Sequence, residues 1–295
     1  MLRIFRLCRF LTGLATAAAL AVAGPAKAQA PINGLIMLIE FEHIEGIRHW
    51  ERELDRRGLS ALVQVQRSVL EQHPADFVRL AAKGYVVSGL DAEKAFWDMP
   101  YEEQLRRMRD AKEMVERVTQ KKMRVFGSRY FAYDENTLRA ADALGIDYVL
   151  GRGTAGALAT VYAPKEYKAK IISVSNVPFA EMGTGSLCDY SLWARGSTGK
   201  DFADVLDKVL AGKPSDLILV SHAYLGGTYT EWWRVYENAL ASKDAAWRSF
   251  DPWVASVKTT AQPFADIPVN RKVKYDTPKP AVPLEKLELL PGIKN

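Results

Sequence analysis

The sequence contains little cysteine, and this excludes a fold held together by disulfides. Only Cys8 and Cys188 occur among 295 residues. Cys8 lies in an amino-terminal segment with the pattern of a removable targeting peptide, so Cys188 would remain alone in the mature chain. A single cysteine in an exported protein is more often a small buried hydrophobic residue than a reactive thiol.

The amino-terminal segment, residues 1–28, has the composition of a secretory signal peptide. Basic residues precede an apolar run, Leu11–Ala23, and small residues lead to cleavage after Ala28, which we prefer to cleavage after Ala30. The apolar run is too short and too rich in alanine for a membrane span, and the mature protein is expected to have none. The sequence therefore predicts an exported protein, with the bacterial periplasm as its expected location.

The mature chain also lacks a strong net charge. Removal of residues 1–28 takes away four basic residues and no acidic ones, which lowers the formal net charge from +5 to +1. The basicity of the precursor belongs to its targeting segment, so it does not indicate a nucleic-acid partner.

Internal repeats, low-complexity tracts and an obvious interdomain linker are also missing. Removing 28 of the 295 residues leaves 267, enough for one large core. Residues 29–262 are predicted to form one domain, and residues 263–295, which are rich in proline and polar groups, are predicted to extend over its surface.

What the sequence does contain is a regular alternation of apolar runs and amphipathic stretches. Strands are expected at residues 34–41, 60–66, 85–89, 122–128, 146–153, 169–178 and 216–224. Helices are expected at residues 47–58, 68–84 with a break at Pro74, 100–120, 134–145 with Asp134 as N-cap, 201–212 and 231–242. This alternation predicts an α/β fold with parallel strands, either a barrel or a doubly wound sheet.

Polar side chains follow several of these strands where turn residues would be expected. The stretch LIEFEH ends in Glu42 and His43, and Asp91, Arg129 and His222 follow other strands. Ligands bind at the carboxyl ends of parallel strands in both candidate folds, so these side chains are expected to converge on one site.

The order of segments from Phe77 to Gly151, together with the LIEFEH and LILVSH strands, resembles the NodB-type polysaccharide deacetylase family, a carbohydrate esterase type. The resemblance covers most of the mature chain. It implies a distorted (β/α) barrel for residues 29–262 and a glycan or N-acetylated sugar as substrate.

The first motif of that family, Thr-Phe-Asp-Asp, supplies a base and a metal ligand. Glu40-Phe41-Glu42-His43 occupies its place here, so the resemblance assigns Glu42 as the base and His43 as a ligand. The last motif contains a histidine that donates a proton, and His222 matches it.

The middle motifs are altered. Two ligand histidines of the family fall on Gly89 and Glu93, and the motif Arg-x-Pro-Tyr appears as Gly127-Ser128-Arg129-Tyr130. A divalent cation, with zinc as the expected metal, would then be held by His43, Glu93 and Asp91, an unusual set with one imidazole. Asp91 and Glu93 also have an ordinary interpretation as solvated acids, and His222 as a core histidine.

Substrate contacts are expected from Arg129, Tyr130 and an aromatic residue that stacks on a sugar ring, either Trp97 or Trp193. Each of these also has an interpretation as a packing residue. The segment 176–199 is long and rich in glycine and serine, and Asp189 within it is a candidate for orienting a catalytic group.

The predicted function is metal-assisted hydrolysis of an N-acetyl amide or an ester on a glycan, with Glu42 as base and His222 as acid. The alternative is an inactive protein of the same fold that binds a glycan or a protein partner. The two differ in whether the side chains named above meet around one cation.

Overall fold

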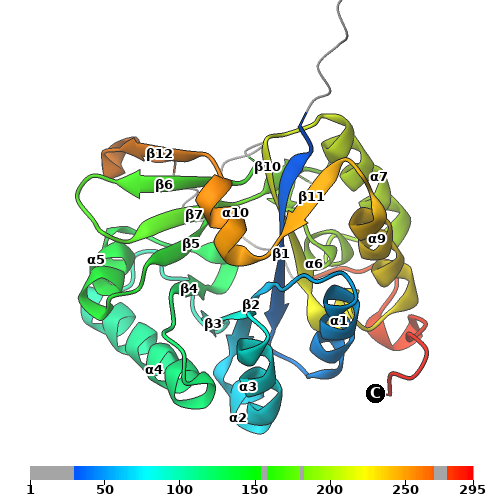
Figure 1. Ribbon diagram of the computed structural model, residues 1–295, viewed down its shortest axis with the longest axis horizontal. Coiled ribbons are helices and arrows are strands. Elements are labelled where there is room, and N and C mark those ends of the chain that lie inside the picture. The colour runs from blue at the N-terminus through cyan, green and yellow to red at the C-terminus, as the bar shows by residue number, and fades with distance from the viewer. Residues whose placement is uncertain (1–29, 154–157, 180–182, 269–277, 295) are drawn as a thin grey trace, which may run out of the picture. The chain divides into compact units, whose positions relative to one another are not determined.

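The computed structural model describes residues 30–153, 158–179, 183–268 and 278–294 (Figure 1). The predicted signal peptide lies outside these residues and stays a prediction. The compact unit of the chain begins at Pro31.

A curled, mostly parallel sheet forms the centre of this unit, in the strand order β10-β1-β2-β3-β4-β5-β7-β6-β12, with β11 also paired to β1. The strands are β1 Ile32–Glu40, β2 Leu62–Gln66, β3 Val86–Asp91, β4 Val125–Ser128, β5 Tyr148–Arg152, β6 Thr160–Pro164, β7 Lys170–Val174, β10 Asp216–His222, β11 Ala245–Arg248 and β12 Thr259–Gln262. Only β6 and β7 pair antiparallel within this sheet. Two short strands, β8 Asn176–Pro178 and β9 Thr184–Ser186, form a separate ribbon.

Helices surround the outer face of the curled sheet, except α10, which lies across one end of it (Figure 1). They are α1 Glu45–Asp55, α2 Arg67–Gln72, α3 Pro74–Ala82, α4 Tyr101–Thr119, α5 Glu135–Leu144, α6 Asp189–Trp193, α7 Gly199–Ala211, α8 Ala223–Gly226, α9 Thr230–Ala241 and α10 Phe250–Ser256. The break at Pro74 separates α2 from α3, and Asp134 caps α5 in a reciprocal capping box, both as the sequence predicted. The predicted α/β fold and distorted (β/α) barrel are confirmed.

The residues of β1 divide the apolar core into two layers. Ile36 and Leu38 face the helices, whereas Leu35, Met37 and Ile39 face the interior of the barrel. At the amino end of β1 the interior layer is closed by α10, where Trp253 donates a hydrogen bond to the carbonyl oxygen of Asn33. The carboxyl ends of the strands therefore remain as the place for a site.

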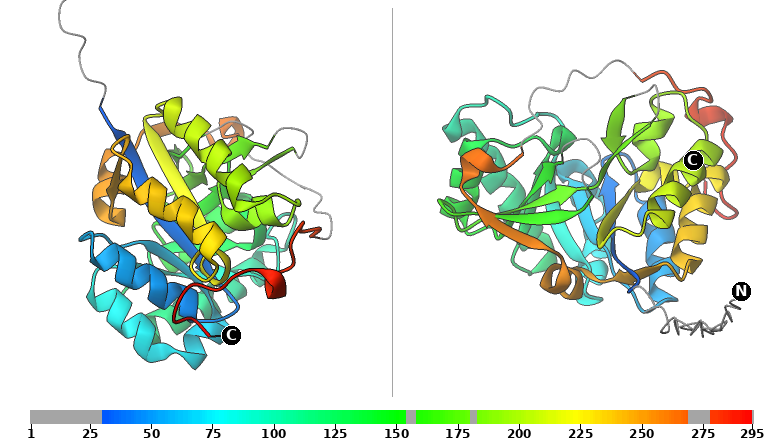
Figure 2. Two further views of the ribbon diagram at one scale, coloured as in Figure 1. Left: turned by 90° about the vertical axis from the view of Figure 1, so that its right-hand side faces the viewer. Right: turned by 90° about the horizontal axis from the view of Figure 1, so that it is seen from above.

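The described carboxyl-terminal residues, 278–294, run along the segments that follow β9 and β10 (Figure 2). Lys279 N–H donates to the Ala194 carbonyl just after α6, and Leu290 N–H donates to the Thr228 carbonyl between α8 and α9. The indole of Trp193 donates to the Val282 carbonyl. Among the described helices, none is both long and apolar enough to cross a membrane.

Candidate functional site

The candidate site is centred on His222, the last residue of β10. The parallel register of β10 and β1 places His222 opposite Ile39 and Ser221 opposite Leu38, so both strands end at the same level. The His222 side chain is 12% exposed and its Nδ1 lies 3.2 Å from Oδ1 of Asp189. Asp189, expected to orient a catalytic group, therefore lies beside the histidine expected to act as the acid.

Asp189 is held in place by a dense set of donors. Its Oδ1 accepts hydrogen bonds from the N–H groups of His222 (2.9 Å) and Tyr190 (2.6 Å), and its Oδ2 accepts one from the Ser221 hydroxyl (2.9 Å). The preceding residue, Cys188, forms an isolated parallel bridge with Val220 of β10. This pairing places the start of α6 beside the end of β10, although more than 30 residues separate them in the sequence.

The Asp189 carboxylate changes the acidity of His222. Burial lowers the pKa of the His222 imidazole, but hydrogen bonding to Asp189 and Cys188 outweighs burial and raises the pKa to about 9. His222 is consequently protonated at neutral pH, which suits a proton donor.

Glu40, the last residue of β1, is a further acid at this end of the sheet. Its side chain is fully buried, and its Oε1 accepts hydrogen bonds from the N–H groups of Glu42 (2.7 Å) and His43 (3.0 Å). Its Oε2 is buried and has no hydrogen-bond partner among the described residues. Burial raises the pKa of Glu40 to about 8, against the lowering effect of these N–H groups and of the His222 charge.

Three aromatic rings surround His222. Tyr190 packs at 4.8 Å between ring centroids, and Phe41 and Tyr224 lie at 6.0 and 6.1 Å in edge-on geometry. Burial raises the pKa of both tyrosine hydroxyls, with neighbouring charges including Glu42 adding to the effect. The tyrosines therefore remain neutral hydroxyl donors next to the imidazole.

Glu42 and His43 lie just beyond the end of β1, in the turn that Glu40 holds. Glu42 is exposed, and its charge acts on the hydroxyls of Tyr190 and Tyr224. The His43 ring lies 6.4 Å from that of Tyr224, and its Nδ1 is 3.8 Å from a carboxylate oxygen of Glu45. The strand ends at Glu40, which allows the adjacent side chains 42 and 43 to lie at the same edge.

Asp91 and Glu93, predicted as metal ligands with His43, are engaged elsewhere. Asp91 Oδ2 accepts a hydrogen bond from Arg107 at 3.0 Å, and Glu93 lies 3.6 Å from the same guanidinium group. Asp91 Oδ1 accepts the N–H groups of Glu93 and Lys94. Within the described ranges, these three side chains do not form a group with donor atoms close enough for one cation. Instead, α4 supplies Arg107 as the counter-ion of both acids.

One other group of donor atoms is compact enough to consider as a metal site. The donor atoms of Cys188, Asp189 and His222 all lie within 4.8 Å of one another, and no other such group of three occurs in the described part of the chain. The donor atoms of Asp189 and Cys188 already take part in hydrogen bonds, however. Asp189 accepts the three hydrogen bonds given above, and the Cys188 sulfur accepts the Ser191 N–H at 3.2 Å and contacts its hydroxyl. These residues do not offer a cation an open ligand set, so no chemical step at this site is assigned to a metal.

Arg129 and Tyr130, predicted to contact substrate, follow β4. The Arg129 guanidinium lies over the Tyr130 ring at 4.9 Å, and the charge of Arg129 opposes the rise in the pKa of Tyr190. Tyr130 and Phe131 have φ values of 64° and 53°. Such left-handed backbone costs roughly 1–3 kcal/mol per residue and is concentrated at functional sites.

Trp97, one of the two stacking candidates, lies between β3 and α4. It is half-buried in the turn before α4, its indole nitrogen is buried without a partner among the described residues, and it makes no ring contact with His222 there. Trp193, the other stacking candidate, packs on Tyr190 at 5.7 Å.

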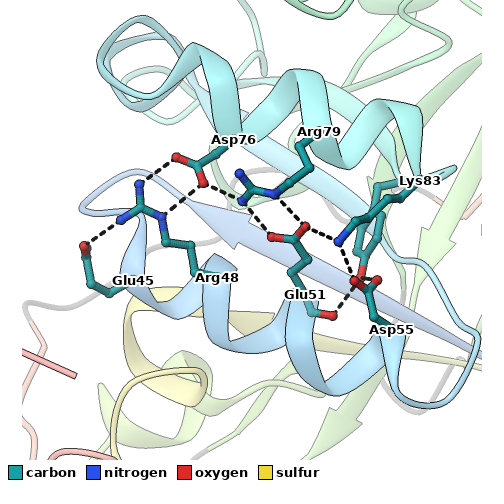
Figure 3. A network of polar contacts seen from close by, with 8 residues as sticks. Glu45, Arg48, Glu51, Asp55, Asp76, Arg79 and Lys83 are labelled. Carbon is teal, nitrogen blue, oxygen red and sulfur yellow. Dashed lines mark hydrogen bonds and ion pairs between the residues drawn. The ribbon is translucent and has the colours of Figure 1, made fainter. Parts of the chain in front are cut away.

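A shallow hollow between α1 and α3 is lined by charged groups and is a second place to consider. Figure 3 shows that its side chains neutralise one another, with Arg79 joined to Glu51 and Asp76, and Lys83 joined to Glu51 and Asp55. The network links two helices and pairs each of these five side chains with an opposite charge, so we regard it as structural.

Sequence reasoning missed Glu40, Tyr190 and Tyr224 as members of the site. Glu40 carried a usable signal, because it is a charged residue inside an otherwise apolar strand segment. Tyr190 and Tyr224 carried none, because an aromatic residue beside a strand end is usually a packing residue.

Comparison with known proteins adds evidence on the fold. No protein-family model and no curated protein match the sequence. A protein from Mycobacterium smegmatis assigned to the polysaccharide deacetylases superimposes with a TM-score of 0.60 and 12% identity, covering 82% of this chain and 98% of its own.

Two other similar structures belong to the carbohydrate esterases. A family 4 acetyl xylan esterase from Clostridium thermocellum in complex with a cobalt ion has a TM-score of 0.52 and 10% identity, over 75% of this chain and 90% of its own. A mutant of a CE4 family pseudoenzyme with restored enzymatic activity has a TM-score of 0.53 and 9% identity. The match covers 75% of this chain and 66% of its own. The expected likeness to the NodB-type deacetylases is thus confirmed for the fold.

Proposed function

We propose that this protein is an exported hydrolase of the deacetylase type, which removes an acyl group from a nitrogen or oxygen of a glycan. The observation that carries the proposal is the Asp189–His222 pair at the carboxyl edge of a deacetylase-type barrel. A protonated imidazole held by a buried carboxylate is suited to donate a proton to a departing amine or alkoxide. Export is inferred from residues 1–28 and is part of the proposal.

In this reaction Glu42 would accept the proton of the attacking water. Glu42 is exposed at the rim of the site and lies within electrostatic range of Tyr190 and Tyr224, the rings that flank His222. Water would add to the acyl carbon, and the neutral hydroxyls of the two tyrosines would be donors for the oxyanion. The bond to nitrogen or oxygen would then break as His222 protonates the leaving atom.

Acetate release from neutral N-acetylglucosamine oligomers and from acetylated xylan oligomers tests the proposal. We expect wild-type protein to release acetate, and His222→Ala and Glu42→Gln to lower kcat/KM by about 10²- to 10⁴-fold. His73→Gln is a matched control, because His73 lies between α2 and α3, away from the site.

Asp189→Asn separates a role in proton transfer from a role in folding. It keeps the shape of the side chain but removes the charge that raises the pKa of His222. The alkaline limit of activity, expected near pH 9 in the wild type, should therefore move to lower pH. An unchanged pH profile would show that Asp189 does not act through His222.

A non-catalytic glycan-binding protein is the second candidate. It is favoured by the separation of the predicted ligands His43, Glu93 and Asp91, since a member of this fold without its usual cation site has lost one source of catalysis. Glycan binding without acetate release, lost in Tyr190→Ala, would support this alternative and contradict the hydrolase proposal.

A further inference from the structure

Charges at the carboxyl edge of the sheet are mostly neutralised within the protein. Asp91 and Glu93 share Arg107, and Asp189 pairs with His222. Two exposed charged groups act on Tyr190, the ring that packs on the imidazole, and form no ion pair in the described parts of the chain. They are the carboxylate of Glu42 and the guanidinium of Arg129. The proposed reaction uses Glu42 as base, which leaves Arg129 without a role.

Arg129 is held in one position by its local backbone. Its N–H donates to the Lys94 carbonyl, and one guanidinium nitrogen lies 3.4 Å from the Glu93 carbonyl oxygen. Arg129 Cζ lies over the Tyr130 ring, 4.9 Å from its centroid. Tyr130 and Phe131 adopt left-handed conformations that non-glycine residues rarely have. An ordinary surface arginine needs none of these constraints.

The position of Arg129 relates it to the leaving group. Tyr190 packs on the His222 ring at 4.8 Å, and the charges of both Arg129 and Glu42 act on the Tyr190 hydroxyl. A sugar whose acyl group meets His222 would thus place a neighbouring substituent or the adjoining sugar near Arg129. A planar guanidinium with free donors matches the geometry of a carboxylate.

We infer that Arg129 selects glycans that carry a carboxylate beside the acylated sugar, an inference that rests on the proposed deacetylase activity. A carboxylate on the neighbouring sugar would accept hydrogen bonds from the guanidinium group. The cation–π contact with Tyr130 would keep the guanidinium facing the substrate.

Two matched oligosaccharides test this inference: neutral N-acetylglucosamine oligomers, and oligomers in which N-acetylglucosamine alternates with a uronic acid. We expect acetate release to favour the uronic acid oligomer by about tenfold, mainly through a lower KM, because a hydrogen bond to a charged group is lost with the neutral one. Arg129→Gln should abolish this preference, because it should lower kcat/KM about tenfold more for the uronic acid oligomer than for the neutral oligomer. Raising NaCl from about 20 mM to about 500 mM should weaken the preference in the wild type.

Arg139→Gln is the control, because Arg139 lies over the Tyr101 ring at 4.4 Å in the same kind of contact, on α5. Arg139→Gln should leave kcat/KM unchanged for both oligomers. If Arg129→Gln lowers kcat/KM equally for both oligomers, or for neither, the inference is overturned while the hydrolase proposal stays intact. If the wild type releases acetate from neither oligomer, the hydrolase proposal fails, and calorimetric measurement of binding then tests the inference. Tighter binding of the uronic acid oligomer that depends on Arg129 would support the inference. Equal binding of the two oligomers would refute it.

Discussion

At the scale of single residues, Glu40 is the least expected group in the molecule. A carboxyl group at the end of a central strand, fully buried and with one oxygen unpartnered among the described residues, opposes folding unless it is protonated. Its Oε1 nevertheless fixes the turn that presents Phe41, Glu42 and His43. The residue thus combines a cost in stability with a role in the shape of the site.

Glu40→Gln should remove a pH dependence of stability. The pKa of Glu40 is about 8 in the folded protein and 4.5 as its ordinary value, so between these pH values the folded state holds a proton that the unfolded state has lost. Stability therefore falls as pH rises from 4.5 to 8, by an amount on the order of 4 kcal/mol. Urea unfolding across this range should show a smaller fall in the variant.

His222 should cause a similar fall in stability at higher pH, and this fall provides the internal control. Its pKa is raised from 6.5 to about 9, so its contribution is complete below pH 6.5 and is lost as pH rises through 9. This part of the slope should remain in Glu40→Gln. A variant whose whole pH profile matches the wild type would show that Glu40 is ionised in the folded protein at neutral pH.

At the scale of elements, α8 is packed against the Asp189–His222 pair without room for a side chain at Gly226. A Cβ atom there would lie 2.3 Å from Asp189 Oδ2 and 2.4 Å from the Ser221 hydroxyl. These two atoms are hydrogen-bonded to each other, so the clash would displace Asp189, the carboxylate that holds His222.

Gly226→Ala should therefore lower stability by about 1–3 kcal/mol and displace Asp189. The measurements are urea unfolding and the NMR titration of His222, whose pKa should move down toward its ordinary value. Gly212→Ala, at the exposed end of α7 where a Cβ would lie 3.3 Å from the nearest carbonyl, is the control and should leave the His222 titration unchanged. Retention of the wild-type titration in Gly226→Ala would contradict the close packing.

The ion network between α1 and α3 is a second feature at this scale (Figure 3). Arg79 makes two hydrogen bonds of 2.8 Å to the carboxylate of Glu51 and a third to Asp76, and both acids are nearly buried. Arg79→Met should cost about 1–3 kcal/mol, because it leaves nearly buried carboxylates with fewer donors.

Arg67→Met is the matched control for this network. Its bond to Glu71 is exposed on both sides, and its loss should change stability by less than about 0.5 kcal/mol. Equal effects of the two substitutions in thermal unfolding would mean that the α1–α3 network contributes no more than a surface pair. Acetate release should survive both changes, since neither arginine lies at the site.

At the scale of the whole molecule, the arrangement of the donor atoms bears on whether the site holds a cation. The acetyl xylan esterase with this fold was observed with a cobalt ion. Here Asp91 and Glu93 are bound to Arg107, and the donors of Cys188, Asp189 and His222 are occupied by hydrogen bonds. We therefore expect the reaction to proceed without a bound metal.

Elemental analysis of the purified protein should accordingly find well below one equivalent of transition metal, and dialysis against a chelator should leave acetate release unchanged. Cys188→Ser serves as the control, because it removes the softest donor of the one compact group found among the described residues. One equivalent of zinc that disappears in this variant, together with activity that a chelator abolishes, would contradict the prediction.

Much of the fold could be read from the chain itself. Alternating strands and helices, the break at Pro74 and the cap at Asp134 are local features, set by side-chain periodicity and backbone hydrogen bonding within a few residues. The polar ends of β1 and β10 were visible for the same reason. A family resemblance then indicated a barrel.

The composition of the site was decided by the tertiary structure. Whether Asp91 holds a cation or an arginine depends on Arg107, 16 residues away on another element. The pairing of Asp189 with His222 depends on the bridge between Cys188 and Val220. The sequence alone determined which segments would become strands and where polar groups would end them. Only packing determined which of those groups meet, because the charge and hydrogen-bonding state of a side chain depend on neighbours that are distant along the chain.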